Sequence, residues 1–392
     1  MPVRGADKPS PAAGGDTLRC YILNRSGAAR AAEQSRRGSY TSSVPRARRL
    51  LLAVVLPLAL AVLFVADVAT GSVSIPFGAT VDILRGAGAE HPTWERIVLD
   101  LRLPQAGTAV LAGAALAVSG LLMQTLFRNP LADPFVLGIS SGASLGVALV
   151  VLGGGLSAGA IVGSGVAGAM AGVSHVAAAI GGAVLMLLVV VFAARRVSTL
   201  TLLILGVLVG YAASALVSIL LRFAAPQNVQ NYVIWTLGEF GGVSWSEAAI
   251  LAPALGVGLL MAAVAVKPLN ALLLGETYAR SMGVAVERNR IWLIASTAVL
   301  AGAVTAFCGP IGFLGIAVPH LARGLLQTSD HRVLLPGTAL LGAAVALLAD
   351  LLTQFPGGPR TLPLNAVTAL LGAPVVLWVI LARRSLRDAP AG

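Results

Sequence analysis

The chain has 392 residues, of which 57% are hydrophobic and only 11% are charged, and its formal net charge is +11. Soluble domains are typically about 45–50% apolar and about 25% charged, so the composition excludes an ordinary soluble domain and indicates a protein built for lipid. The basic residues cluster in an N-terminal tail and in short gaps between apolar runs, a distribution typical of a membrane protein rather than a nucleic-acid-binding one. Cys20 and Cys308 lie in unrelated contexts and suggest neither a disulfide framework nor a metal site.

Three segments divide the chain. Residues 1–47 are rich in Arg, Ala, Gly, Ser and Pro without an apolar period, which predicts a disordered basic tail. No apolar stretch precedes a cleavage site in this tail, so a signal peptide is not expected. Residues 48–385 are expected to form one transmembrane domain, and 386–392 a short C-terminal tail.

Apolar runs recur at about 20 residues, the length that a membrane-spanning helix needs. They predict an all-α membrane protein with ten transmembrane helices. The second is long enough to tilt or to project beyond the bilayer, and residues 76–87 and 227–240 are expected to form short interfacial helices. The expected spans are 49–70, 94–126, 135–152, 173–194, 199–222, 245–266, 288–307, 312–326, 333–353 and 363–382.

The positions of Lys and Arg predict the orientation. With ten spans and both termini in the cytoplasm, the inner segments beyond the tail hold twelve of these residues and the outer segments five. The positive-inside rule therefore supports ten spans with cytoplasmic N and C termini. It also places residues 269–290 in the cytoplasm, between spans six and seven, and a glycine-rich insert, 153–172, outside.

Residues 269–290 form a polar island between two apolar runs. Glu276 lies where the first turn of a short helix would favour an anion, and Gly283 lies where that helix would end in a left-handed residue. Nothing in this island looks catalytic. We interpret it as a short coupling helix that another protein holds.

Several motifs are missing. Lys8 and Lys267 are the only lysines, and neither lies in a phosphate-binding G-x-x-x-x-G-K-[ST] loop, so the chain is not expected to hydrolyse ATP itself. Asp67 and Asp350 are the main acidic residues in or beside the spans, which disfavours a proton-coupled transporter. A secondary transporter and a membrane scaffold that moves nothing are the alternatives. His320 has no second ligand nearby in the sequence and is interpreted as a hydrogen-bonded structural group.

Small residues recur every four positions in two runs, on what would be one helix face. They predict either close helix packing or the lining of a wide path. The two runs are Gly138, Gly142 and Gly146, and Ala109, Gly113 and Ala117.

Four ordered blocks carry a family resemblance over about residues 50–385. They are R-L-P from Arg102 through N-P-L-A-D-P at 129–134 to L-G-I-S-S-G-A at 137–143; L-G-E at 274–276 with Ala279 and Gly283; G-P-I-G-F-L-G at 309–315 with Pro319, His320 and Arg323; and L-P-L-N at 362–365 with Thr368 and G-A-P at 372–374. The chain resembles the permease family that imports iron–siderophores, haem and cobalamin with an ATP-binding-cassette (ABC) ATPase.

This resemblance implies ten helices per subunit in the inner membrane and a path formed by two permeases, identical or paralogous. It implies two ATPase subunits, which bind the ATP and Mg, and an external solute-binding protein, while this chain binds no cofactor and is not an enzyme. The expected cargo is a ferric siderophore or similar metal chelate moved by alternating access, with haem or cobalamin as the alternative.

The resemblance also assigns roles to residues. Arg102 corresponds to an arginine that docks the binding protein; the alternative is an interfacial side chain that reaches towards water. The family often has a second arginine where this chain has Gln105, and Arg96 could take over the role of that arginine. The stretch 198–201 corresponds to a cytoplasmic gate, with a helix cap as the alternative. The ATPase-coupling residues are Leu274, Gly275, Glu276, Ala279, Arg280 and Gly283; the gate and path residues are Ser198, Thr199, Thr201, Gly138 and Gly142; and the structural motif residues are Asn129, Pro130, Gly312, Pro319, His320, Gly372 and Pro374.

Overall fold

A computed structural model describes residues 50–88, 91–153, 175–355 and 361–387, and within these ranges the chain is helical, without strands. Contacts divide the chain into two units, residues 1–50 and 51–392. Every helix discussed below belongs to the second unit. The expected basic tail, almost all of the glycine-rich insert and the last five residues lie outside the described ranges.

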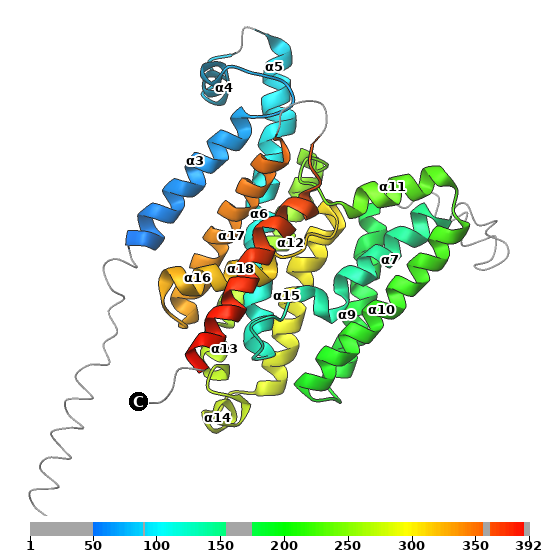
Figure 1. The fold of residues 1–392 in the computed structure, drawn as a ribbon, viewed down its shortest axis with the longest axis vertical. Coiled ribbons are helices and arrows are strands. Elements are labelled where there is room, and N and C mark those ends of the chain that lie inside the picture. Colours follow the sequence, from blue (N-terminus) through cyan, green and yellow to red (C-terminus); the bar gives the residue numbers. More distant parts are fainter. Residues whose placement is uncertain (1–49, 89–90, 154–174, 356–360, 388–392) are drawn as a thin grey trace, which may run out of the picture. The chain divides into compact units, whose positions relative to one another are not determined.

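The helices follow one another with short connections, and Figure 1 labels them along the chain. They are η1 (Leu51–Val55), α3 (Leu56–Ala69), α4 (Phe77–Leu84), α5 (Pro92–Arg96), η2 (Ile97–Arg102), α6 (Leu103–Leu126), η3 (Pro134–Leu137), α7 (Ile139–Val151), α9 (His175–Ala194), α10 (Thr199–Phe223), α11 (Pro226–Thr236), α12 (Trp245–Val264), α13 (Val266–Leu272), α14 (Glu276–Ser281), α15 (Val286–Cys308), α16 (Leu314–Leu326), α17 (His331–Thr353) and α18 (Leu364–Arg387).

Seven helical stretches in the described part are long and apolar enough to cross a membrane. The all-α membrane class is therefore confirmed. One of these stretches, Pro92–Leu126, is 35 residues long and runs through α5, η2 and α6, as expected for a projecting second span. The predicted third, eighth and tenth spans coincide with the shorter apolar helices α7, α16 and α18. Helices α4 and α11 form where interfacial helices were expected.

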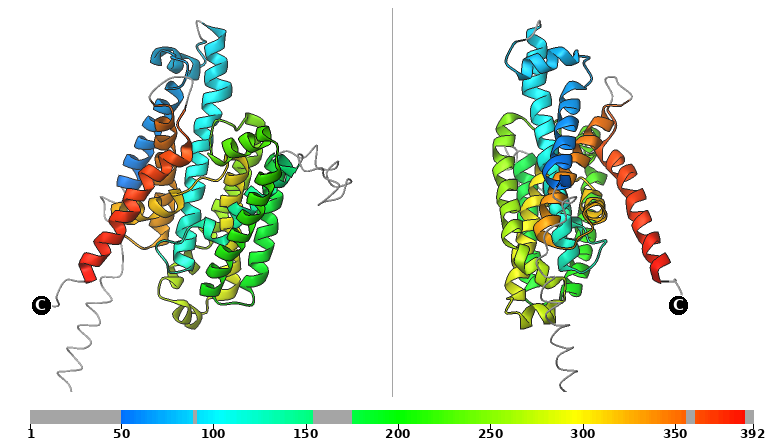
Figure 2. Two further views of the ribbon diagram at one scale, coloured as in Figure 1. Left: turned by 45° about the vertical axis from the view of Figure 1, so that its right-hand side comes forward. Right: turned by 90° about the vertical axis from the view of Figure 1, so that its left-hand side faces the viewer.

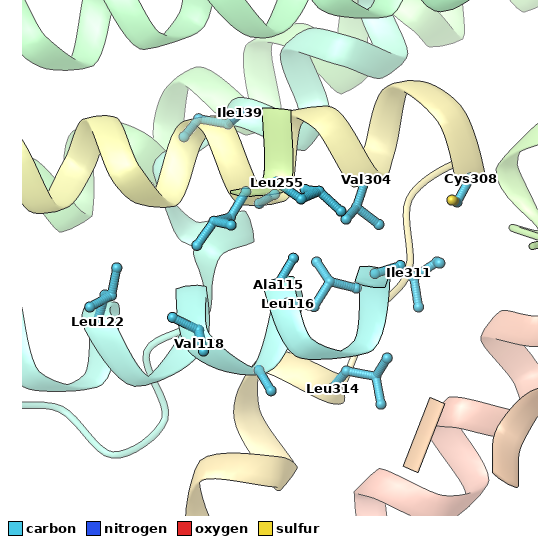
Figure 3. Packing of buried hydrophobic residues seen from close by; sticks show 14 of the residues in the cluster. Ala115, Leu116, Val118, Leu122, Ile139, Leu255, Val304, Cys308, Ile311 and Leu314 are labelled. Atoms are coloured by element: carbon cyan, nitrogen blue, oxygen red, sulfur yellow. The ribbon is translucent and has the colours of Figure 1, made fainter. Parts of the chain in front are cut away.

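The core is centred on α6. In the most apolar part of Pro92–Leu126, which contains α6, 78% of the residues are buried, against 22% for each of α9, α10 and α12, so α6 is central and the other three are peripheral. Figure 2 shows α6 between the group that contains α3, α16 and α17 and the group that contains α7, α9 and α10. Leu116 and Leu122 of α6 pack with Leu255 of α12 and Val304 of α15 in this core (Figure 3).

Glycines allow the closest helix crossings. A Cβ on Gly113 of α6 would lie 2.3 Å from the carbonyl oxygen of Gly342 of α17, and a Cβ on Gly342 would lie 2.4 Å from that of Gly113. Gly142 of α7 and Gly182 of α9 make the same reciprocal approach, at 2.5 and 2.0 Å. Backbones this close leave no room for a side chain, so Gly113 and Gly142 serve helix packing at these crossings, and the path role of Gly142 stays a prediction.

Gly138 does not belong to the helix face predicted for it. It has a left-handed conformation, φ 73°, and precedes α7 instead of lying within it. The one-face pattern is therefore wrong for this residue. Its α-carbon faces α10, where an added Cβ would lie 3.2 Å from the carbonyl oxygen of Gly206.

Candidate coupling and gating site

The polar island forms the short helix that its sequence predicts. Helix α14 follows Gly275, which has φ 105°, and it ends before Gly283, which has φ 81°; Glu276 lies in its first turn. Ala279 is fully buried and anchors the helix. Helix α14 lies at the opposite end of the helices from α4 and α5 (Figure 1).

The exposed face of this island is apolar, although it lies at the polar end of the helix bundle. Leu274, Tyr278 and Met282 are 62%, 52% and 48% exposed. Arg280 forms an ion pair with Glu287 across 3.1 Å and connects α14 to the start of α15. Exposed apolar patches with a polar rim are typical of surfaces that bind another protein.

A hydrogen bond joins this island to the predicted gate. The hydroxyl of Thr199 at the start of α10 donates to Oε1 of Glu276 at 2.9 Å. Arg290 of α15 lies beside this pair, where its guanidinium donates to Thr199 Oγ1 at 3.5 Å, to the Val197 carbonyl at 3.1 Å and to the carbonyl of Ala194. The ends of α9, α10, α14 and α15 are thereby tied together.

The residues around Thr199 also cap α10. The Ser198 side chain accepts a hydrogen bond from the backbone N–H of Thr201 at 3.2 Å, and the two hydroxyls lie 2.8 Å apart. The helix-cap interpretation is thus confirmed, and the gate role stays a prediction. Leu200, between them, is 69% exposed. A cavity of about 420 Å³ opens here, lined in part by Arg128, Thr199 and Glu276.

The proline-containing turn after α6 is stabilised by its own polar side chains. Asn129 Oδ1 accepts from the N–H of Leu131 at 3.0 Å, and Asp133 Oδ1 accepts from the N–H of Phe135 at 2.9 Å. His320 Nε2 pairs with the Pro130 carbonyl at 2.7 Å, which confirms the interpretation of His320 as a hydrogen-bonded structural group. Burial raises the pKa of Asp133 to about 6, although the Phe135 N–H works against this shift.

The C-terminal motifs meet around one asparagine. Asn365 accepts from the N–H of Gly312 at 3.0 Å and donates to the carbonyls of Pro310 at 2.6 Å and Thr236 at 2.9 Å. A Cβ on Gly372 would lie 2.6 Å from that of Phe313, a residue with φ 68°. Two motif prolines lie inside helices, Pro319 in α16 and Pro374 in α18.

The guanidinium of Arg102 is directed into the protein. The residue is 7% exposed, and it donates to the carbonyls of Val68 at 3.2 Å, Ala69 at 3.0 Å and Val73, capping the end of α3. Docking by Arg102 stays a prediction and requires this side chain to leave those carbonyls. Arg96 is exposed nearby in the chain.

Two polar residues were missed as functional candidates. Arg290 ties the predicted gate to the start of α15, and nothing in its sequence context marks it apart from its place in the polar island. Gln105 donates to Asp350 Oδ2 at 2.8 Å, so the residue that departs from the family pattern has an internal partner. Within the described residues no group of three His, Cys, Asp or Glu side chains could hold a metal ion.

Comparison with known proteins agrees with this geometry. The model of the FecCD transport family matches residues 59–382. The vitamin B12 import system permease protein BtuC of Salmonella paratyphi A (strain ATCC 9150 / SARB42) is 40% identical over 289 residues, which cover 73% of this chain and 84% of that protein. BtuC of Escherichia coli O9:H4 (strain HS) is 40% identical over 295 residues, covering 75% and 86%.

A solved inward-facing structure assigned to the metal-chelate type of ABC transporters matches with a TM-score of 0.70 and 27% identity, covering 84% of this chain and 97% of the other. Fold and site define a multi-pass helical protein of the inner membrane, with a short helix exposed at one end of its bundle. The chain belongs to the FecCD transport family, and this confirms the resemblance drawn from its motifs.

Proposed function

We propose that this chain is the permease subunit of an ABC importer that moves a large metal chelate across the inner membrane. The match to the FecCD family over residues 59–382 carries this proposal. The hydrogen bond between Thr199 and Glu276 supports it, because it joins the expected ATPase contact directly to the expected gate. Energy comes from separate ATPase chains, two of which act on a pair of permeases.

In this mechanism the membrane domain crosses the bilayer ten times, with α7, α16 and α18 as its three short spans and both termini in the cytoplasm. A loaded solute-binding protein docks outside. ATP binding closes the ATPase pair, which pulls on α14, and the two permeases move against each other to open the path between them. The exposed Leu274, Tyr278 and Met282 provide the apolar contact for the ATPase.

Two metal chelates are candidates for the cargo. A ferric siderophore is the cargo that the motifs suggested, whereas the two BtuC relatives favour a corrinoid such as vitamin B12. Uptake of radiolabelled cobalamin and of labelled ferric siderophores should be compared between cells with and without the gene. The chelate whose uptake is lost is the cargo, and unchanged uptake of every chelate would contradict the import proposal.

The energy source separates an ABC importer from a secondary transporter. Uptake should stop when ATP is depleted while the proton gradient is kept, and a nucleotide-binding ATPase should co-purify with the chain. Uptake that persists without ATP would refute the proposal.

A further inference from the structure

A second cavity lies at the α14 end of the bundle, beside the coupling and gating site, and Ala194 and Glu287 belong to both. It has a volume of about 560 Å³ and forms where α9 ends, α12 ends and α15 begins. Helices α9 and α12 each pack against α15, so α15 provides the floor of the cavity, with Ile291 and Trp292, and the other two helices flank it.

The charged residues of this cavity favour an anion. Arg195 and Arg288 line it and are exposed, and neither guanidinium has an ion-pair or hydrogen-bond partner among the residues that the structure describes. The one acidic residue in the lining, Glu287, is already paired with Arg280 at 3.1 Å. Arg196 adds a third positive charge beside Arg195, with its guanidinium carbon 4.2 Å from the centre of the Phe192 ring.

The surface next to this basic rim is apolar. On α9, Leu188 and Phe192 are 61% and 59% exposed, and on α12, Leu260 and Val264 are each 66% exposed. In a chain that spans a membrane, such side chains face lipid. The cavity therefore lies where the apolar surface meets the charged end of the helices.

Trp292 marks the same boundary. Its ring is 41% exposed, and its indole N–H donates to the Met261 carbonyl at 2.9 Å, which fixes the ring against the end of α12. Tryptophan is enriched where a membrane meets water. The distribution of Lys and Arg assigns this end to the cytoplasm, where the leaflet carries anionic lipids, and basic pockets between helices on that side bind their headgroups.

We propose that this cavity binds one anionic phospholipid. Its phosphate lies between Arg195 and Arg288, and an acyl chain extends over Trp292 and the exposed apolar faces of α9 and α12. The unpaired positive pair and the adjoining apolar surface together match a phospholipid better than they match a free phosphate.

The test uses the purified full-length chain in detergent, with phosphatidylglycerol or phosphatidylcholine added, and counts retained lipids by native mass spectrometry. We expect one phosphatidylglycerol to be retained and phosphatidylcholine to be lost. Arg195→Gln with Arg288→Gln should lower retention about thirtyfold, since each basic residue near an anionic lipid contributes about fivefold. Lys267→Gln with Arg332→Gln is the matched control, because it removes the same charge from exposed residues on the same side, and it should leave retention unchanged.

Three results would overturn the proposal: equal retention of both lipids, equal losses in the test and control variants, or displacement of the lipid by millimolar inorganic phosphate. If the double variant does not fold, Arg288→Lys and Arg288→Gln are compared instead. Retention with lysine and loss with glutamine would support a charge-based lipid site, and equal retention by the two would overturn it.

Discussion

Replacing Thr199 by valine removes one hydroxyl and keeps the branched shape of the side chain. That hydroxyl donates to Oε1 of Glu276 at 2.9 Å, and both side chains are half-buried. A hydrogen bond to a charged group contributes about 1.5–3 kcal/mol, and partial exposure places this one near the lower limit. Because about 1.4 kcal/mol corresponds to a tenfold change, transport per ATP hydrolysed should fall at most about tenfold.

The assay measures cargo uptake and ATP hydrolysis together in proteoliposomes that contain the complete importer. Thr236→Val is the matched control, because its hydroxyl donates to the Val233 carbonyl within α11, away from the coupling and gating site. In a Glu276→Ala background, Thr199→Val should have no further effect, since its partner is gone. If Thr199→Val leaves the transport-to-ATP ratio unchanged, or if Thr236→Val lowers it equally, the link does not transmit coupling.

Three further predictions concern packing, pH and docking. Gly120→Ala would place a Cβ 1.8 Å from the carbonyl oxygen of Gly315 and should destabilise the protein by about 3 kcal/mol, the upper end for overpacking. Gly107→Ala is the control, because its Cβ would meet no atom within 4 Å and should not destabilise the protein. Equal thermal unfolding temperatures of the two variants in detergent would contradict this. The folded pKa of Asp133, about 6, exceeds its usual value of about 4, so ionising this carboxyl lowers the stability of the protein as pH rises from about 4 to 6. Asp133→Asn keeps the turn acceptor and should gain at most about 3 kcal/mol of stability over the wild type between pH 4 and 7. Parallel plots of stability against pH for the two proteins would refute this. Arg102→Glu should weaken binding of the solute-binding protein, more at low salt, and equal affinity at both salt concentrations would remove Arg102 from the docking site.

Local structure followed closely from local sequence. Gly275, Glu276 and Gly283 predicted a short capped helix because each has a conformational or electrostatic preference that acts within one turn, and α14 has the expected limits. Asn129 bonds to the backbone two residues further on, a local preference of asparagine in turns. The long second helix followed from its continuous apolar character.

Contacts between distant segments could not be predicted in this way. The partners Thr199 and Glu276 are 77 residues apart, and no pattern in either segment specifies which side chain the other meets. The family resemblance placed Arg102 towards the binding protein, but the unpaired carbonyls at the end of α3 offer it acceptors inside the protein. Gly138 was assigned to a helix from its spacing alone, whereas its positive φ depends on how the turn before α7 meets α10.

The reciprocal glycine contacts limit how this protein can change shape. At the crossing of α6 and α17, an alanine methyl lies beside each glycine: the Ala346 Cβ beside Gly113, and the Ala117 Cβ beside Gly342. Sliding either helix by one turn would bring a methyl group onto a backbone carbonyl, so the two helices can only travel as a single rigid body. At the crossing of α7 and α9, the Met186 Cβ lies beside Gly142 and limits sliding in a similar way. Distances between spin labels within either pair should stay constant through the ATP cycle, so the motion is confined to the junctions between these bodies, among them the turn at residues 127–138.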